Sequence, residues 1–254
     1  MKPRPLLEVC VEDARGIAAA VAGGADRIEL CSALVVGGLT PPASLVRLAA
    51  QPPIAVHMLA RPRAGDFIYD ATEQTLVADD IRTAADAGLD GVVIGASRAD
   101  GRLDPACLSR WVALARTLGI TRGRPLSLTL HRAFDLTPDL PAALEEAAAL
   151  GFDRILTSGG APRAIDGAAM LSRLAAAAGD RIGVMAGSGV SPGNAAAILA
   201  TGVREIHASC RSMPSAAPNA DLLRFGFVEA ASQVTDPAIV AQLATMVRAV
   251  RESA

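Results

Sequence analysis

The sequence predicts an α/β fold in which strands and helices alternate eight times around a closed barrel. Short apolar segments repeatedly follow longer helical segments, and short turns that contain glycine lead from helix to strand. The length of 254 residues suits one such barrel. We therefore predict a (β/α)8 TIM-like barrel, formed as a single domain by residues 1–254. A doubly wound open sheet is the alternative, but no G-x-G-x-x-G follows the first strand, where residues 10–13 read CVED.

The expected elements follow the apolar segments and the turns in chain order. The eight strands are expected at residues 5–10, 26–31, 54–59, 90–95, 126–131, 153–157, 181–186 and 204–208. The eight helices are expected at residues 12–22, 41–50, 72–87, 104–119, 138–150, 165–178, 191–201 and 237–251. The longest irregular stretch, residues 209–235, follows the last strand, and we expect it to form a lid or a contact between subunits.

Two chemical signatures mark the helix boundaries. Several helices are expected to begin at a side-chain oxygen followed by proline, because the oxygen accepts a hydrogen bond from a free helix N–H and proline needs no acceptor in the first turn. These pairs are Thr40-Pro41, Asp104-Pro105, Thr137-Pro138, Ser191-Pro192 and Asp236-Pro237. Helices are expected to end at glycines in the left-handed conformation, such as Gly24 and Gly151.

Composition and charge exclude several classes of function. The formal net charge of −2 provides no basic surface, and five Phe, one Tyr and one Trp are too few to stack bases, so we expect no nucleic acid partner. No apolar run is long enough to span a membrane, and acidic residues interrupt the N-terminal segment. We therefore expect no membrane partner and a cytoplasmic location. The four scattered cysteines are expected to be reduced thiols.

Two predicted strands share a Glu-x-Cys pattern. Because the side chains of a strand alternate between its two faces, Glu8 and Cys10 share one face of the first strand. Glu29 and Cys31 likewise share one face of the second strand. Both faces of a parallel sheet covered by helices are normally apolar, so a carboxylate and a thiol on a buried face require an explanation.

Histidines also gather on the predicted strands. All three of them, His57, His131 and His207, fall on strands, and the carboxyl ends of those strands meet at one mouth of a barrel. An isolated strand histidine is commonly a hydrogen-bonded core residue, but three at the same end favour a site. The candidates for a catalytic acid or base are therefore Glu8, Glu29, His57 and His131.

Arginines and glycine turns near the same mouth predict an anion site. Arg61 and Arg63 are held apart by a proline, in a relation that suits a carboxylate or a phosphate. The alternative is a structural ion-pair network with Asp66 or with the strand glutamates. Backbone N–H groups of two glycine turns are further candidate donors, at Gly159, Gly160, Gly187 and Gly189. Tight turns also need glycine for their conformation alone.

Seven motifs, in order along the chain, create a family resemblance. They are L-E-V-C at 7–10, A-D-R-I-E-L-C-x-x-x-x-x-G-G-L-T-P at 25–41, H-x-x-x-R-P-R-x-G-D-F at 57–67, H-R-A-F-D at 131–135, L-T-S-G-G at 156–160, M-A-G-S-G-V at 185–190 and E-I-H-A-S at 205–209. With these motifs the chain closely resembles the CutC copper-homeostasis family. The resemblance implies a TIM-like barrel, a cytoplasmic setting, a role in copper tolerance or trafficking, and Cu(I) bound by Cys10 and Cys31.

Two functions are favoured by these residues, and a scaffold or oligomerisation role is a third possibility. The first is a cytoplasmic copper-homeostasis protein with Cys10 and Cys31 as thiolate ligands, because Cu(I) is soft and prefers sulfur. The second is a barrel enzyme acting on a small phosphorylated or carboxylated metabolite, because Glu8 and Glu29 have no use in a Cu(I) site. The expected ligand is thus a copper ion or a small anion, and any other cofactor is left open. Association into a homo-oligomer is a further expectation.

Overall fold

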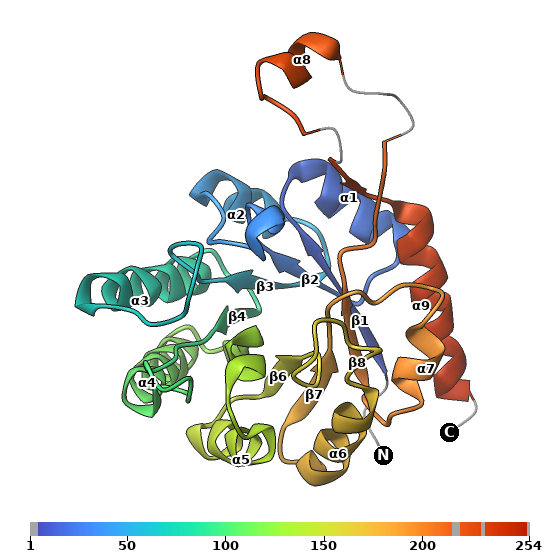
Figure 1. The fold of residues 1–254 in the computed structure, drawn as a ribbon. Helices are drawn as coiled ribbons and strands as arrows, with labels where there is room; N and C mark the ends of the chain where they lie inside the picture. The colour runs from blue at the N-terminus through green and yellow to red at the C-terminus, as the bar shows by residue number, and fades with distance from the viewer. Residues whose placement is uncertain (1–4, 215–218, 230–231, 253–254) are drawn as a thin grey trace.

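Eight parallel strands form a closed barrel with helices around it, which confirms the predicted (β/α)8 fold (Figure 1). The computed structural model describes residues 5–214, 219–229 and 232–252. Each strand pairs with the next one along the chain, and the last strand closes against the first. The barrel strands are β1 (Leu6–Val11), β2 (Arg27–Leu30), β3 (Ala55–Leu59), β4 (Gly91–Ile94), β5 (Ser127–Leu130), β6 (Arg154–Thr157), β7 (Gly183–Ala186) and β8 (Glu205–Ala208).

Helices cover the outside of the barrel, as Figure 1 shows, and only α8 stands away from it. The helices of the described chain are α1 (Ala14–Gly23), α2 (Ala43–Ala49), α3 (Ala71–Asp86), α4 (Pro105–Thr121), α5 (Leu140–Leu150), α6 (Ala168–Ala178), α7 (Ala195–Leu199), α8 (Ala220–Arg224) and α9 (Pro237–Glu252). Two 3-10 turns lie in the loops after β2 and β5, namely η1 (Leu34–Val36) and η2 (Arg132–Leu136). The predicted glycine ends are confirmed for α1 and α5, where Gly24 and Gly151 take φ values of 78° and 90°.

Two predicted helix starts are confirmed and three are wrong. Asp104 caps α4 by accepting a hydrogen bond from Cys107 N at 3.0 Å, and α9 begins at Pro237. The starts predicted at Thr40, Thr137 and Ser191 lie upstream of the observed ones, which are Ala43, Leu140 and Ala195. At Thr40 the reason is a competing contact, because its hydroxyl donates to Asp80 Oδ2 at 2.7 Å and accepts from Arg61 N at 3.0 Å.

The outward faces of the strands form the main hydrophobic core together with the helices. Leu7 and Val9 of β1, like Ile28 and Leu30 of β2, are completely buried in this shell. The alternate residues of the same strands point into the barrel, since neighbours along a strand face opposite sides. Several of these inward residues are charged, in place of the branched aliphatic side chains that commonly fill such a barrel. A buried polar interior therefore lies beneath the mouth.

Two glycines of the fourth strand region make room for histidine rings. A Cβ atom at Gly91 would lie 2.7 Å from the ring of His57, and one at Gly95 would lie 2.5 Å from the ring of His131. Both distances are far inside van der Waals contact. Glycine at these two positions thus allows imidazole rings from the neighbouring strands to occupy the barrel interior.

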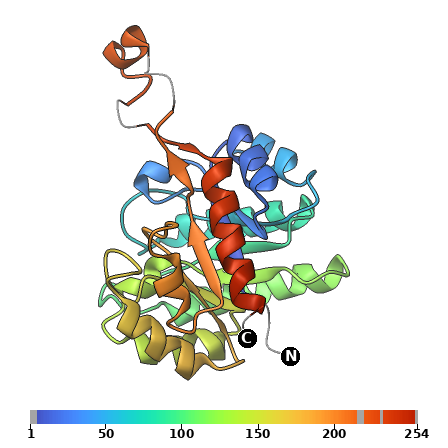
Figure 2. The same ribbon diagram turned by 90° about the vertical axis from the view of Figure 1, so that its right-hand side faces the viewer.

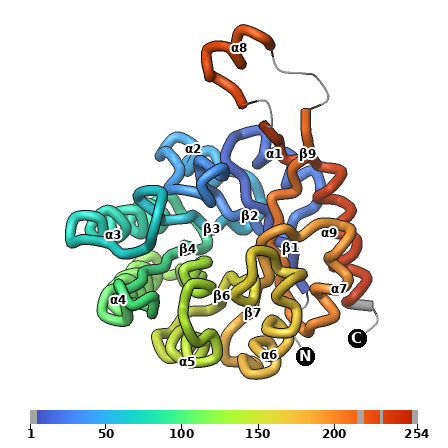
Figure 3. Tube along the Cα trace, in the orientation of Figure 1, coloured from blue at the N-terminus to red at the C-terminus, as the bar shows by residue number. Residues whose placement is uncertain are grey.

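Between β8 and α9 the chain leaves the barrel as an arm, described at residues 213–214, 219–229 and 232–233. Its stem is an antiparallel pair of short strands, β9 (Arg211–Ser212) and β10 (Val234–Thr235), and α8 lies near its tip. Figures 1 and 2 show α8 far outside the layer of helices, and Figure 3 shows β9 joining the barrel beside α1. Within the described ranges, none of the helices has the length and hydrophobicity that a membrane crossing requires.

Candidate functional site

A cavity of about 420 Å³ opens at the carboxyl ends of the barrel strands. One part of its wall, here called the carboxylate side, consists of Cys10, Glu29, Cys31 and His207. Another part, here called the donor side, consists of His131 and residues 188–190 in the loop after β7. Barrel enzymes place their active sites at this end of the fold, because the loops that follow the strands converge there.

A network of buried charges supports the carboxylate side. Arg27 forms ion pairs with Glu8 and, at 2.5 Å, with Glu205. A further guanidinium N–H of Arg27 contacts Met185 Sδ at 3.2 Å. Burial alone would raise the pKa of Glu8, but the adjacent Arg27 and His207 hold that pKa well below its ordinary value. Glu8 is therefore a permanent anion inside the barrel.

His207 lies between the two strand glutamates. Its Nδ1 is 2.8 Å from Glu8 Oε1 and 3.3 Å from Glu29 Oε2. Burial alone would lower the pKa of His207, but the neighbouring Cys10 and Glu29, together with the hydrogen bond to Glu8, raise it well above the ordinary value. The side chain is therefore an imidazolium that donates to the carboxylates at neutral pH.

Glu29 differs from Glu8 although both are buried. Burial raises the pKa of Glu29 to about 7, the nearby charge of Glu8 adds to this effect, and His207 and Arg27 oppose it. Glu29 also lines the cavity, whereas Glu8 does not. Two carboxyl groups whose environments separate their pKa values are the arrangement that assigns one of them to proton transfer. Glu29 is the group that can both hold and release a proton near neutral pH.

Both predicted copper ligands, Cys10 and Cys31, reach the cavity wall. Cys10 lies on β1 and Cys31 directly follows β2, so two soft sulfur donors of the kind that Cu(I) prefers line one part of the wall. The thiol of Cys31 donates to Val11 O at 3.4 Å, and burial raises its pKa strongly. Metal binding at Cys31 would therefore have to displace this proton.

The same region offers a second set of metal donors. Ligand atoms of Glu8, Glu29 and His207 all lie within 4.8 Å of one another, a grouping of oxygen and nitrogen donors that suits a harder cation than Cu(I). Arg27 is already paired with Glu8, however, and His207 carries a proton in this arrangement. A cation would have to displace both, so the charge network is complete without one.

His57 lies deeper than the cavity. Its Nδ1 is 3.5 Å from a guanidinium nitrogen of Arg154, and its ring packs over Gly91. Burial, with the charges of Arg27 and Arg154, holds the pKa of His57 well below its ordinary value. Of the four residues predicted as acid or base, the structure brings Glu29 and His131 to the cavity and places Glu8 and His57 beneath it.

His131 is the neutral histidine of the cavity wall. Its Nδ1 accepts a hydrogen bond from Ala133 N at 3.1 Å, so the ring proton is on Nε2. Burial and the charge of Arg61 lower its pKa to about 3. Nε2 is buried and has no hydrogen-bond partner among the described residues. The ring of Phe67 lies 4.6 Å from the imidazole, centroid to centroid.

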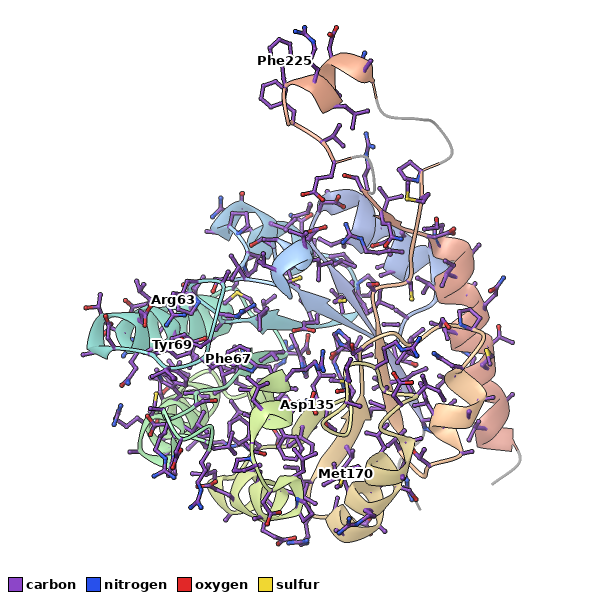
Figure 4. All side chains as sticks on the ribbon, in the orientation of Figure 1. Arg63, Phe67, Tyr69, Asp135, Met170 and Phe225 are labelled. Carbon is purple, nitrogen blue, oxygen red and sulfur yellow. The ribbon has the colours of Figure 1, made fainter. Side chains whose placement is uncertain are left out.

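Of the two arginines predicted to bind an anion, Arg61 reaches the cavity and Arg63 does not. Arg61 is buried and lines the cavity, and its guanidinium donates to the carbonyls of residues 36, 38 and 65. Arg63 does not line the cavity; it pairs with Glu73 and, at 2.9 Å, with Asp66. Figure 4 shows Arg63 next to Tyr69 near α3, whereas Asp135 lies close to the barrel strands.

Of the four glycines predicted to donate to an anion, one reaches the cavity. Gly189 lines the cavity, whereas Gly159, Gly160 and Gly187 do not. Their N–H groups bond within the protein: Gly159 to Thr157 Oγ1 at 2.9 Å, Gly160 to Asp135 Oδ1 at 3.1 Å and Gly187 to Thr157 O at 3.0 Å. The N–H groups of these three glycines are thus engaged within the protein and are not available to an anion.

Three charged residues of the interior were not predicted from the sequence, and a fourth was not given its role. Arg27, Arg154 and Glu205 form its ion pairs, and His207 was noted on a strand without a role. The available signal was the same alternation used for the cysteines, because Arg27 is two residues before Glu29 on β2. Glu205 and His207 are related in the same way on β8.

Comparisons with known proteins show which family this chain belongs to. The model of the CutC family matches residues 5–212. A CutC family protein from Sinorhizobium medicae is 50% identical over 236 residues, covering 92% of this chain and 93% of the relative. One from Caulobacter vibrioides is 49% identical over 248 residues, covering 97% and 98%. The crystal structure of CutC from Streptococcus agalactiae, described as a candidate copper homeostasis protein, has a TM-score of 0.74 at 30% identity and covers 81% of this chain and 98% of that one. The chain therefore belongs to the CutC family.

Proposed function

We propose that this chain is an enzyme that transfers a proton to or from a small anionic metabolite bound in the cavity. The observation that supports the proposal is the position of Glu29, which lines the cavity beside His207 and has a pKa near the pH of a cell. A carboxyl group with an ordinary pKa would be ionised almost completely and would be a weak acid–base catalyst at neutral pH.

Each neighbour of Glu29 has a distinct part in this proposal. Glu8 stays ionised because Arg27 compensates its charge, and it orients His207 through the 2.8 Å contact. The His207 imidazolium then stabilises negative charge that develops on a substrate oxygen when a proton leaves an adjacent carbon. Apolar residues of the wall limit the access of water, and they include Leu59, Phe67 and Leu156.

The test begins with a measurement that needs no substrate. Carboxyl ¹³C NMR of the protein labelled at glutamate should reveal one resonance that titrates near pH 7 and is missing in Glu29→Gln. Metabolites with phosphate or carboxylate groups are then incubated with the enzyme in D2O, and exchange of their C–H protons is followed. We expect Glu29→Gln to slow that exchange by about 10²–10⁴-fold. A Glu29→Gln variant that exchanges as fast as the wild type would contradict the proposal.

Cu(I) binding by Cys10 and Cys31 is the second candidate function. Its support is that both thiols lie on one wall of the same cavity, and that a relative is described as a candidate copper homeostasis protein. The test is an anaerobic Cu(I) titration against a colorimetric competitor. Tight binding should be lost in the double variant Cys10→Ser/Cys31→Ser and kept in Cys107→Ser, because Cys107 is a buried residue of α4 that does not line the cavity. Binding that survives in the double variant would exclude this site.

The arm supports association into a homo-oligomer, because large apolar side chains are exposed along it, with Phe225 60% and Phe227 79% accessible. The free thiols of all four cysteines support a cytoplasmic setting. The paired change Phe225→Ser/Phe227→Ser should shift the mass measured by light scattering toward the monomer. Ile120→Ser is the matched control, because Ile120 is 83% exposed at the end of α4. Fluorescence microscopy of a tagged chain tests the location.

A further inference from the structure

The loop after β7 presents backbone donors to the cavity. Ser188, Gly189 and Val190 all line it, and no hydrogen bond joins their N–H groups to another described residue. Ser188 and Gly189 take φ values of 80° and 67°, both in the left-handed region. Successive backbone N–H groups in a turn can form a concave nest that binds anions. A serine in this region is strained, and strain of this kind concentrates at functional sites.

The same loop is held in place through its acceptors. Ser188 O accepts from Ala164 N at 2.9 Å, and Gly189 O accepts from Asn194 Nδ2 at 2.8 Å. The hydroxyl of Ser188 donates to Pro162 O at 2.8 Å. The carbonyls of Ser188 and Gly189 therefore have partners, whereas the N–H groups of residues 188–190 have none among the described residues. Ser188 and Val190 are half-buried and Gly189 is exposed, so these N–H groups are open to a ligand that accepts hydrogen bonds.

His131 gives independent evidence for a ligand that accepts hydrogen bonds. It is only 5% exposed, it lines the cavity, and its Nε2–H has no partner in the part of the chain that the structure describes. Since Nδ1 is occupied by Ala133 N, the imidazole can act toward a ligand only as a donor. A buried donor without an acceptor costs free energy, which a ligand oxygen would recover.

Arg61 supplies the charge that such a ligand would balance. The side chain is 6% exposed and lines the cavity, yet its guanidinium nitrogens bond only to backbone carbonyls. No carboxylate of the described residues pairs with it, unlike Arg27 and Arg132, which pair with Glu8 and Asp135. A buried cation is normally compensated by an anion, and here the cavity is the place left for one.

We infer that the donor side of the cavity is a subsite for the phosphoryl group of a phosphate monoester. Its oxygens accept from the N–H groups of residues 188–190 and from His131 Nε2, and Arg61 balances the charge. Several donors on two sides suit a tetrahedral group with three free oxygens better than a planar carboxylate with two. The inference rests on the proposed function, because it places the remainder of a phosphorylated substrate toward Glu29.

The test uses inorganic phosphate as the probe, followed by calorimetric titration and by ³¹P NMR. His131→Asn keeps an acceptor for Ala133 N and removes the Nε2 donor, whereas His131→Gln places an amide donor near the Nε2 position. Val190→Pro removes one N–H of the nest. We expect saturable phosphate binding that falls at least tenfold in His131→Asn and in Val190→Pro and is largely restored in His131→Gln. Circular dichroism verifies the fold of each variant.

Arg63→Ala is the matched control, because it removes an arginine that lies close in sequence and outside the cavity wall. It should bind phosphate like the wild type. Wild-type protein that binds no phosphate, or variants His131→Asn and Val190→Pro that bind it undiminished, would overturn the inference. Acetate bound as tightly as phosphate would overturn the choice of a phosphoryl group.

Glu29→Gln separates this inference from the proposed function. It should bind phosphate like the wild type, because the subsite does not use the Glu29 carboxyl group. If phosphate does not bind but Glu29 still titrates near pH 7, the phosphate inference alone is contradicted. Phosphate binding without that titration would defeat the proton-transfer proposal alone.

Discussion

The carboxylate side and the donor side of the cavity each contain a histidine ring largely removed from solvent, and they have opposite electrostatics. Burial lowers the pKa of both His207 and His131, yet the pKa of His207 ends well above the ordinary value and that of His131 at about 3. The difference comes from the neighbours, which are Cys10 and two glutamates for His207 and the Arg61 cation for His131. One side is thus organised around exchangeable protons, and the other around neutral donors without acceptors.

Removing the cation beneath the carboxylate side should have the largest effect. Arg27→Met leaves Glu8 ionised and buried with its main ion pair broken. Loss of one partner of a buried pair costs about 3–5 kcal/mol. We expect urea denaturation to reveal a decrease of that size in the free energy of unfolding, and the pKa of Glu8 to rise because its strongest favourable charge is gone.

Arg63→Met provides the comparison for that result. Arg63 also pairs with two carboxylates, but its side chain is 37% exposed and solvent screens the charges. Its loss should cost about 0–1 kcal/mol. Equal losses for the two arginine variants would mean that the interior network contributes no more than a surface ion pair.

Glu29→Gln should alter how stability depends on pH. The folded state raises the pKa of Glu29 from 4.5 to about 7, so folded protein binds more protons than unfolded protein between these values. The stabilisation of the folded state that comes from the raised pKa of Glu29 is fully present below pH 4.5 and is lost as pH rises through 7. One pKa unit corresponds to about 1.4 kcal/mol, so Glu29→Gln should be more stable than wild type above pH 7 by about 3 kcal/mol.

The measurement is urea denaturation of both proteins from pH 5 to pH 9. The two should have similar free energies of unfolding at the acidic end and diverge as Glu29 ionises in the wild type. Parallel curves over the whole range would mean that Glu29 titrates normally, and the carboxylate side would then lose its distinction from an ordinary buried ion-pair network.

Much of the fold and the inward position of the cysteines could be predicted from the sequence. The period of two in β1 and β2 separates Leu7 and Val9 from Glu8 and Cys10, and the shell around the barrel contains the first pair. The start of α7 could not be predicted in this way, because Asn194 Oδ1 accepts from Ser191 N at 2.9 Å and holds Ser191 in a turn. A capping oxygen and a proline are compatible with either structure.

The candidate site was less predictable because its chemistry depends on distances across strands. Arg61 and Arg63 occupy one irregular loop with no period, so nothing local indicates that one points inward and the other outward. The state of His207 depends on the pairing of β1 with β8, which places it opposite Glu8. Sequence spacing identifies such residues but not the pKa values that their neighbours impose.

Gly95→Ala tests the packing of the donor side. The added Cβ would lie 2.5 Å from the His131 ring, so the ring must move or the strand must shift. Overpacking of this kind costs about 1–3 kcal/mol, and displacement of Nε2 should weaken phosphate binding as well. Gly193→Ala is the control, because a Cβ there lies 3.8 Å from the nearest atom, Ser191 Oγ. Thermal denaturation and phosphate titration of both variants provide the readout.

Ser188→Gly should change the free energy of unfolding less than the other variants do. Glycine adopts the φ of 80° without the strain of a side chain, a gain of about 1 kcal/mol, but it also loses the hydroxyl bond to Pro162 O. The two contributions nearly cancel, so the free energy of unfolding should change by less than about 1 kcal/mol. Phosphate binding should persist, because the backbone N–H remains. A large loss of binding would mean that the serine hydroxyl, rather than the backbone, contacts the ligand, and the donor side would then depend on side chains as the carboxylate side does.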